Sequence, residues 1–447
     1  MWMSGARNKG TQKIEGIILM AVVFTFVFSS FPSVTAAHGS VSEGASSTIS
    51  AMETDVSYTL KVFGNANMDD TIDMRDVTYI KLVIFGKKPE TEFCDANYDG
   101  RVSMLDVVQT KLIIVGKEGE LTFVDANGND VTVRLPLSRI IVLNTDVAEA
   151  VRALGAKERV VGICERIKEM STFFPYLSEQ QSVGKWSSPD IEQIIGLNPD
   201  AVFAYGQWPS TEKLEDKLIG TDIAVIRLDF YKIETLRGEM NILGYLLGAE
   251  EEARAYLEWY DRIVSEIDER VSTLSEEEKP EVFLASTYKI EEVETEIKTY
   301  GRGSGMHGLC ERAGGKNIAA EQEGTYLKVE VEWVIKQNPD VIVGLSYEGG
   351  YETDDESEMK SQYEGIIGLS GFETIDAVKN NRVHLIEDDV AFSPAMPIGL
   401  AYFAKWLHPD LFSDFDPQVI HQEYINKFCG IDFDVTKHGV FVYPKAS

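Results

Sequence analysis

Short apolar runs and amphipathic segments alternate along the chain after residue 119. Residues 140–143 (IIVL) form one apolar run, residues 147–154 repeat apolar positions at helical spacing, and residues 160–163 (VVGI) form the next run. Buried parallel strands have continuous apolar runs, and the helices between them carry one apolar face. The pattern therefore predicts an α/β fold in which a parallel sheet has helices on both faces.

Two later segments repeat each other at an offset of 140 residues. Residues 189–203 read PDIEQIIGLNPDAVF, and residues 329–343 read VEVEWVIKQNPDVIV. Each segment predicts a short helix, an Asn-Pro-Asp turn and a buried strand, because proline restricts the residue before it and ends the helix. At the same offset, Glu192 corresponds to Glu332, and Trp186 corresponds to Tyr326. The duplication predicts two similar lobes.

A long stretch with one apolar stripe lies between the two copies. From residue 250 to 274 the apolar positions keep a helical spacing of three or four. Such a helix spans about 37 Å at about 1.5 Å per residue, which is enough to bridge two lobes. We therefore expect a first α/β lobe over residues 119–249, a spine helix over 250–275 and a second α/β lobe over 276–447. The expected fold class is α/β, with two Rossmann-like lobes joined by a single long helix.

A different repeat, at an offset of 30 residues, occupies residues 58–118. Each copy places oxygen-bearing side chains at positions 1, 3, 5, 9 and 12 of a twelve-residue loop, and position 7 offers its backbone carbonyl. Calcium takes about 6–8 oxygen ligands in a flexible geometry, and this alternation turns one ligand after another inward. The predicted ligands are Asn65, Asn67, Asp69, Thr71, Asp73 and Asp76 in loop 1, and Asp95, Asn97, Asp99, Arg101, Ser103 and Asp106 in loop 2. The alternative is an Asn/Asp-rich turn before a helix, but two copies in register argue against it.

Each loop leads into an apolar helix, expected over residues 77–85 and 107–115, which a glycine closes. The duplicated loop-helix unit, with Asp rather than Glu at position 12, resembles a dockerin. The resemblance implies two bound Ca²⁺ ions, a cohesin-containing partner, and attachment to a scaffold or a cell surface. Loop 1 departs from the family pattern, because Asn65 replaces the first Asp and Asp70 stands where loop 2 has Gly100. We therefore expect loop 2 to be the stronger calcium site.

The first 57 residues have the order of a secretory signal followed by a linker. Three basic residues precede an apolar run over residues 16–28, and small residues end the segment at 35–37. That run is short for a membrane span, which needs about 20 residues. We expect a signal peptide over residues 1–37 and a Ser-rich linker over 38–57, with a retained signal anchor as the alternative. The protein is thus expected outside the cytoplasm, secreted or attached to the cell surface.

The composition excludes several classes of partner and site. Seventy-three acidic residues against 42 basic ones give a formal net charge of −31. Nucleic-acid phosphates would repel such a surface, and binding would release few counterions, so no nucleic-acid partner is expected. The cysteines are too scattered for a zinc ribbon or an iron–sulfur motif. We expect buried thiols or at most one disulfide among Cys94, Cys164, Cys310 and Cys429.

An ordered set of segments over residues 121–443 carries a second resemblance. Residues 124–128 (VDANG), the runs RIIVL and ALGAKERVVGI, the two Glu…Asn-Pro-Asp segments and the spine helix follow one another. This set resembles an iron-chelate/cobalamin-type solute-binding protein of ABC transporters. The resemblance implies a cleft between the lobes that holds an iron chelate (siderophore), haem or a corrinoid. It also implies an ABC permease as partner, whose arginines pair with Glu192 and Glu332 at the lobe tips.

Aromatic residues concentrate where segments leave the strands toward the expected cleft. Their large flat faces suit a corrin or porphyrin ring, and Arg302 in a Gly-rich loop is suited to an anionic chelate. The candidate ligand-binding residues are Trp186, Tyr205, Trp208, Phe230, Tyr231, Tyr300, Arg302 and Tyr326. By the same resemblance, Trp186, Tyr205 and Tyr326 match positions where cobalamin-binding relatives place ligand-contacting aromatics. We expect Trp186 and Tyr326 to face each other across the cleft. The alternative for each aromatic is a core position at a strand end, and His307 is expected to be structural.

No catalytic centre can be placed from the sequence, which has neither a Ser-His-Asp arrangement nor an assignable carboxylate pair, so no enzyme is expected. The alternative to a transport function is a structural or scaffold surface protein whose solute-binding lobes no longer serve transport. Residues 351–360 (YETDDESEMK) predict an exposed acidic insertion to which no role is assigned.

Overall fold

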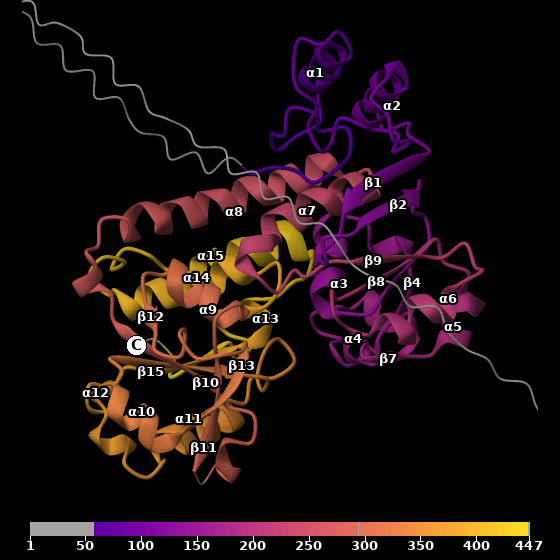
Figure 1. Ribbon diagram of the computed structural model, residues 1–447. Helices are drawn as coiled ribbons and strands as arrows, with labels where there is room; N and C mark the ends of the chain where they lie inside the picture. Colours follow the sequence, from indigo (N-terminus) through magenta and orange to yellow (C-terminus); the bar gives the residue numbers. More distant parts are fainter. Residues whose placement is uncertain (1–57, 294, 446–447) are drawn as a thin grey trace, which may run out of the picture. The chain divides into compact units, whose positions relative to one another are not determined.

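Five parallel strands form the sheet of the first α/β lobe, in the order β5-β4-β3-β8-β9 (Figure 1). The computed structural model describes residues 58–293 and 295–445, so the expected signal peptide and linker lie outside the described residues. The strands are β3 (Ile140–Val142), β4 (Val160–Ile163), β5 (Gln181–Ser182), β8 (Ala201–Ala204) and β9 (Ala224–Arg227). The predicted parallel sheet is therefore confirmed in this lobe.

Helices cover both faces of this first sheet, which explains its continuous apolar runs. Ile140 and Val142 of β3 pack into one apolar cluster with residues of α3 (Thr145–Ala153). Ile141, which points the other way, packs with Ile194 of α5 (Ile191–Leu197) and with residues around α6 (Glu215–Leu218). Successive side chains of a strand point to opposite faces, so a fully apolar run serves a sheet that is buried on both sides.

The sheet of the second lobe is mixed, which corrects the expectation of two similar parallel lobes. Its order is β13-β11-β10-β14-β15-β16, and β12 pairs with β10. β10, β12, β14 and β15 are parallel, whereas β11, β13 and β16 run antiparallel to their neighbours. The strands are β10 (Glu281–Ser286), β11 (Glu296–Tyr300), β12 (Lys316–Asn317), β13 (Tyr326–Glu330), β14 (Val341–Ser346), β15 (Val383–Glu387) and β16 (Val442–Tyr443). The segment between β10 and β11 is shorter than the dozen or so residues that a parallel crossover needs, so β11 returns antiparallel.

The two Asn-Pro-Asp segments adopt the same local structure in both lobes. Asn198 ends α5 and Asn338 ends α10 (Val331–Gln337), both in the left-handed conformation with φ of 46° and 51°. Asp200 then accepts hydrogen bonds from the amides of residues 138 and 139, and Asp340 accepts one from the amide of Glu281. In each lobe the turn thus ties the start of one strand to the chain entering its neighbour.

The expected spine helix is present as α8 (Glu250–Val271), preceded by α7 (Ile233–Leu247). Its predicted stripe is buried, and the hydroxyl groups within that stripe find partners. Tyr256 donates to the carbonyl of Pro394 at 2.7 Å, and Tyr260 donates to the carbonyl of Ile233 at 3.0 Å. The largest apolar cluster includes residues of both lobes, of α8 and of α14 (Met396–Leu407). The lobes therefore share one core along the spine.

The segment at 351–360 begins as a contact between the lobes and not as an exposed insertion. The Tyr351 ring is buried and stacks on Phe173 of the first lobe, with ring centroids 3.9 Å apart. The Glu352 carboxylate accepts hydrogen bonds from the amides of Thr172 and Phe173, both at 3.0 Å. The buried ring of Tyr351 corrects the expectation for the start of this segment, whereas its acidic residues Glu352, Asp354, Asp355 and Glu358 are exposed as expected.

Residues 58–118 form a small helical module with its own apolar cluster. α1 (Met74–Ile84) and α2 (Met104–Ile114) each begin with a reciprocal capping box, whose N-cap residue is the ninth of the preceding loop. Gly86 and Gly116 follow the helices with φ of 63° and 62°, a conformation that favours glycine. The module meets the hairpin of β1 (Glu120–Val124) and β2 (Asp130–Arg134) through a bridge between Val62 and Phe123.

All four cysteines are buried free thiols, which confirms the first of the two expected alternatives. The remaining helices are α4 (Glu165–Glu169), α9 (Gly305–Arg312), α11 (Ser357–Ile367), α12 (Asp376–Lys379), α13 (Asp388–Ala391) and α15 (Pro417–Tyr424). Among the described residues, the helices are all too short or too polar to cross a lipid bilayer.

Candidate functional site

The carboxyl ends of the parallel strands in the first lobe carry a set of polar groups. Ligands of open parallel sheets bind at this edge, because the loops that leave the strands converge there. Asp146 follows β3, Tyr205 follows β8 and Asp229 follows β9. The Tyr205 hydroxyl donates to Asp146 Oδ1 at 2.6 Å, and the amide of Gly206 donates to Asp229 Oδ1 at 2.8 Å. We call this set of residues, with the aromatic rings beside it, the first-lobe edge.

Four of the predicted ligand-binding residues form one aromatic row on the first-lobe edge. Trp208 contacts Trp186, Trp186 contacts Tyr205, and Tyr205 contacts Tyr231, with centroid separations of 6.5, 5.8 and 5.6 Å. All three contacts are edge-to-face, a favoured geometry for aromatic pairs. Trp186 and Trp208 remain 41% and 52% exposed, so the row offers apolar surface to a ligand.

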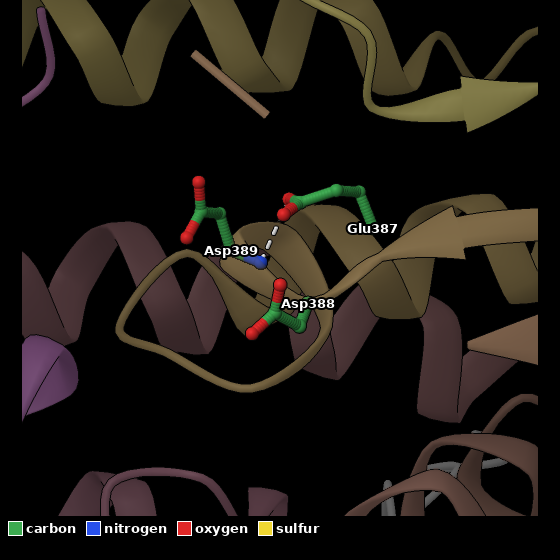
Figure 2. A group of neighbouring side chains, drawn as sticks. All are labelled: Glu387, Asp388 and Asp389. Carbon is green, nitrogen blue, oxygen red and sulfur yellow. Dashed lines mark hydrogen bonds between the residues drawn. The ribbon is translucent and has the colours of Figure 1, made fainter. Parts of the chain in front are cut away.

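The corresponding edge of the second lobe carries tyrosines and carboxyl groups. Tyr326 contacts Tyr300 with centroids 6.1 Å apart, and Tyr347 follows β14. Residues 387–389 (Glu-Asp-Asp) close β15 and open α13, and one oxygen from each lies within 4.8 Å of the others (Figure 2). Glu387 accepts a hydrogen bond from the amide of Asp389 at 2.8 Å, the dashed line in Figure 2. We call these residues the second-lobe edge.

The two edges approach each other. Gly305, at the start of α9 in the second lobe, packs so closely on Tyr231 that an added Cβ would lie 2.5 Å from the Tyr231 carbonyl oxygen. Burial raises the pKa of Tyr205 well above its usual range, Asp146 adds to the shift, and Asp388 of the second lobe contributes further. Burial and then Asp229 raise the pKa of Tyr231 to about 12, with a smaller contribution from Tyr326. Residues from both lobes thus determine the electrostatics of one shared region.

Carboxyl groups outnumber cations in this shared region. Burial raises the pKa of Asp146 to about 7, although the Tyr205 hydroxyl favours its charged form. Burial also raises the pKa of Glu387 and Asp389, and the neighbouring carboxylates add to both shifts. The Lys232 ammonium is already paired, since it lies 3.2 Å from Asp229 Oδ2. A ligand at these edges meets carboxyl groups, tyrosine hydroxyls and a lysine that is already paired with a carboxylate.

Three further residues from the sequence analysis, Phe230, Arg302 and His307, lie outside the aromatic row. Phe230 is fully buried in the main apolar cluster, so its predicted place on the ligand surface is wrong, because the side chain alternates inward where Tyr231 turns outward. Arg302 pairs with Glu321 at 2.7 Å. His307 contacts the Asn317 amide through Nδ1 at 3.2 Å, consistent with its expected structural role.

Trp186 and Tyr326 each contact rings of their own lobe. The expectation that they face each other remains a prediction. Sequence reasoning missed the polar residues of the two edges: Asp146, Asp229, Tyr347, Glu387, Asp388 and Asp389. The sequence did contain a signal for them, because each lies at the end of an apolar strand run or within a few residues after it. Reading the residues after every parallel strand would have found them.

Glu192 and Glu332 occupy equivalent places on the two lobes. Each lies exposed in the first turn of its helix, α5 or α10. A carboxylate in the first helical turn is favoured by the helix dipole, so a local structural role is compatible with docking. The structure thus presents one exposed carboxylate from each copy of the repeat.

The two predicted calcium loops have nearly the same internal hydrogen bonds. In loop 1 the Asp76 carboxylate accepts from the amides of Asn67 and Asp73, and in loop 2 Asp106 accepts from those of Asn97 and Ser103. The fourth loop position is left-handed in both copies, with φ of 62° and 55°. The shared geometry shows that the repeat preserves loop conformation as well as residue type.

The loops differ at two positions that bear on cation binding. In loop 2 Asp95 accepts from the amides of Asp99 and Gly100, whereas Asn65 in loop 1 leaves a buried Oδ1 without a partner. Such an orphaned oxygen, among hard oxygen donors, fits a calcium ion. In loop 1 the guanidinium of Arg75 also pairs with two of the predicted ligands, Asp69 at 3.0 Å and Asp73 at 2.8 Å. Loop 2 has Leu105 at that position, so its carboxylates have no such competitor.

Comparison with known proteins identifies the family of the two lobes. The family model described as periplasmic binding protein matches residues 140–390, more than half of the chain. The chain belongs to this family. A curated relative is the uncharacterized ABC transporter substrate-binding lipoprotein YvrC of Bacillus subtilis, 25% identical over 289 residues, which covers 64% of this chain and 84% of the relative. The cobalamin-binding protein of Halobacterium salinarum is 26% identical over 218 residues, covering 48% of this chain and 55% of that protein.

Solved structures of this family share the fold. The TroA-like periplasmic binding protein FepB from Veillonella parvula aligns with a TM-score of 0.59 at 21% identity, over 72% of this chain and 98% of that one. The molybdate-binding protein MolA of Haemophilus influenzae aligns with a TM-score of 0.57 at 20% identity, over 70% of this chain and 98% of that one. The shared fold confirms the two-lobed α/β architecture.

The raised pKa of Asp146 predicts a measurable pH dependence of stability. Its unfolded pKa lies near 3.9, and burial raises the folded pKa to about 7, so the native state retains a proton that the unfolded state loses between these values. The free energy of unfolding should therefore fall as pH rises through this window, by about 1.4 kcal/mol per pH unit for this group. Asp146→Asn should flatten the fall in urea denaturation between pH 5 and 7. Asp222→Asn, at a side chain that is 98% exposed, is the control. An equally steep slope in Asp146→Asn would contradict the assignment.

Proposed function

We propose that this protein is an extracytoplasmic solute-binding protein that delivers a metal chelate to an ABC importer. The observation that carries the proposal is the aromatic row on the first-lobe edge, together with the close packing of Gly305 of the second lobe on Tyr231 of that row. Large apolar faces that end in hydroxyl groups suit a bulky, flat ligand held between two lobes. Membership in the periplasmic binding protein family supports the same role.

The chemistry of the two edges favours a corrinoid over the other ligands of this class. A molybdate ion, a ferric catecholate or the propionates of haem would favour cations at the site, whereas Lys232 is paired with Asp229 and Arg166 acts on the carboxyl groups of Asp388 and Asp389. A corrinoid offers a large ring with amide side chains, which can form hydrogen bonds with tyrosine hydroxyls and with carboxyl oxygens. Several relatives are cobalamin-binding or vitamin B12-binding proteins, which supports this choice. Iron chelates and haem remain the other members of the class to be tested.

The module over residues 58–118 supports attachment of the protein to a scaffold or surface. We propose that it is a dockerin whose two loops hold Ca²⁺ and whose helices dock onto a cohesin-containing protein. Its helices leave an unusual amount of apolar surface outside: Met74, Phe85, Met104, Leu105, Val108 and Val115 are all at least half exposed. Exposed apolar patches of this kind mark protein interaction sites. A scaffold protein without transport activity is the alternative, and failure to bind any chelate would favour it.

Binding of a corrinoid should depend on Trp186. The ligand class is tested by calorimetric titration of the purified chain with cobalamin, haem and ferric siderophores. Cobalamin should bind most tightly. Trp186→Ala should weaken that binding by at least about tenfold, or about 1.4 kcal/mol, because it removes an exposed ring of the aromatic row. Folding should survive, since the indole is 41% exposed.

Tyr176→Ala is the matched control for Trp186→Ala, because Tyr176 is equally exposed at 40% and lies outside the aromatic row. Unchanged affinity in Trp186→Ala would remove the row from the ligand site. Absence of binding to every chelate would refute the transport proposal itself.

Charge reversal at the lobe tips should affect the permease and spare the ligand. Glu192→Lys and Glu332→Lys should each weaken association with the reconstituted permease, because like charges would then oppose its arginines. Affinity for the soluble ligand should stay within about twofold of wild type, since both side chains are exposed and neither belongs to the aromatic row or to the carboxyl groups of the two edges. Glu212→Lys and Glu373→Lys make the same charge change at other exposed sites and should leave permease binding intact. Loss of ligand binding in either tip variant would show that the proposed geometry is wrong.

Removal of Arg75 should strengthen the first calcium site. Arg75→Leu gives loop 1 the residue found in loop 2 and frees Asp69 and Asp73 for the ion. Calorimetry on the full chain should show a gain of about threefold to tenfold at the weaker site, a modest effect because the ion pair is exposed. Lys111→Leu removes another exposed cation of the module and should change neither site, whereas Asp95→Ala should abolish the tighter one. Equal affinity of both loops in wild type would contradict the ranking.

A further inference from the structure

The small module is joined to the α/β body through a specific set of contacts made by loop 1. The Asp70 carboxylate lies 3.2 Å from the Arg237 guanidinium of α7, and the Asn241 amide donates to the Asp70 carbonyl at 2.7 Å. The amide of Ile72 donates to the Tyr245 hydroxyl at 2.9 Å. α7 thus holds residues 70–72, which are positions 6 to 8 of the loop.

Packing beside these bonds shows that the fit is specific. The Tyr58 hydroxyl lies against Gly238, where an added Cβ would come within 1.8 Å of it. The Arg237 guanidinium lies 5.0 Å from the Tyr58 ring centroid and also pairs with Asp261 of α8 at 3.0 Å. Arg237 therefore connects loop 1, the module's first aromatic residue and the spine helix.

One peptide group lies at the centre of this arrangement. The carbonyl of Thr71 is the seventh-position ligand in the proposed calcium loop, and the amide of Ile72 belongs to the same planar unit. In a trans peptide these two groups point in opposite directions. When the Tyr245 hydroxyl accepts from the amide on one side, it orients the carbonyl on the other side toward the loop interior.

We infer that Tyr245 is a supporting residue of calcium site 1, and that calcium bound there stabilises the solute-binding body as well as the module. This inference rests on the proposed calcium loops. Because binding and folding free energies are linked, an ion that holds residues 70–72 in place also favours their contacts with α7. Loop 2 contacts the β1–β2 hairpin through the Tyr98 hydroxyl, 2.6 Å from Asp130, and reaches neither α7 nor α8 by such bonds among the described residues. Calcium at loop 1 is therefore the ion coupled to the spine.

Intrinsic fluorescence separates the body from the module. The described tryptophans, Trp186, Trp208, Trp259, Trp333 and Trp406, all lie in the body and none lies within residues 58–118. The sixth tryptophan, Trp2, precedes the described residues and is replaced by Phe in every chain tested, so thermal unfolding followed by tryptophan fluorescence reports on the body. In the full chain carrying Asp95→Ala, which silences loop 2, calorimetry with CaCl₂ reports on loop 1 alone.

In this Asp95→Ala background, saturating calcium should raise the tryptophan-detected melting temperature by about 3–5 °C relative to EDTA. Adding Tyr245→Phe, which removes only a hydroxyl, should weaken calcium binding about tenfold, as loss of a supporting hydrogen bond commonly does. It should also reduce the calcium-dependent rise. Tyr79→Phe removes a tyrosine hydroxyl within the module, bonded to the Pro89 carbonyl, and should change neither measurement.

Asp70→Gly provides a second, module-side test. It gives loop 1 the glycine of loop 2 and removes the partner of Arg237, so calcium should still bind while the tryptophan-detected rise shrinks by at least half. Calcium binding without any rise in the melting temperature of the Asp95→Ala chain would overturn the coupling and leave the calcium proposal intact. Calcium affinity unaffected by Tyr245→Phe would remove the supporting role. Absence of calcium binding in the wild-type chain would instead refute the calcium loops, and the coupling with them.

Discussion

Burial of the apolar faces of α7 and α8 is the constraint on which the rest of the structure depends. The largest apolar cluster runs without a break from the small module through α8 into both lobes. Tyr256 and Tyr260 can lie in this core because each hydroxyl bonds to a backbone carbonyl, one of them at Pro394 in the second lobe. A single helix therefore sets the positions of both sheets, and with them the distance between their carboxyl ends.

This arrangement buries the carboxyl groups of Asp146 and Glu387 and leaves those of Asp388 and Asp389 partly exposed. Burial raises the pKa of Asp146 to about 7, and the Glu387–Asp389 group shows the same direction of shift. The desolvation of these groups costs stability, and their retention beside an exposed aromatic row is typical of a binding site. The contact of Tyr351 and Glu352 with Phe173 holds the lobes together next to this region. The candidate ligand site and the contact between the lobes thus lie in neighbouring loops.

Much of this fold could be predicted because its signals are local. The Asn-Pro-Asp turns, the helix caps and the calcium-loop register depend on backbone preferences within a few residues, and the duplications doubled each signal. The mixed second sheet was missed because the direction of β11 depends on the length of its connection as well as on its apolar run. Phe230 and Tyr351 were misplaced for a related reason. Hydrophobicity and charge do not show which face of a strand end or loop meets another element.

The sequence by itself determined the elements, the two repeats, the spine and the residue types in the two predicted calcium loops. The aromatic row was predicted as a set, but its order and its exposure came from the structure. Only the tertiary structure brought Asp388 near Tyr205, and Tyr245 to the amide of Ile72, 173 residues away along the chain. Periodicity and capping act over one or two turns, where backbone geometry sets the spacing. Contacts between distant segments depend on how whole layers pack, and a local sequence pattern does not show which distant segments will meet.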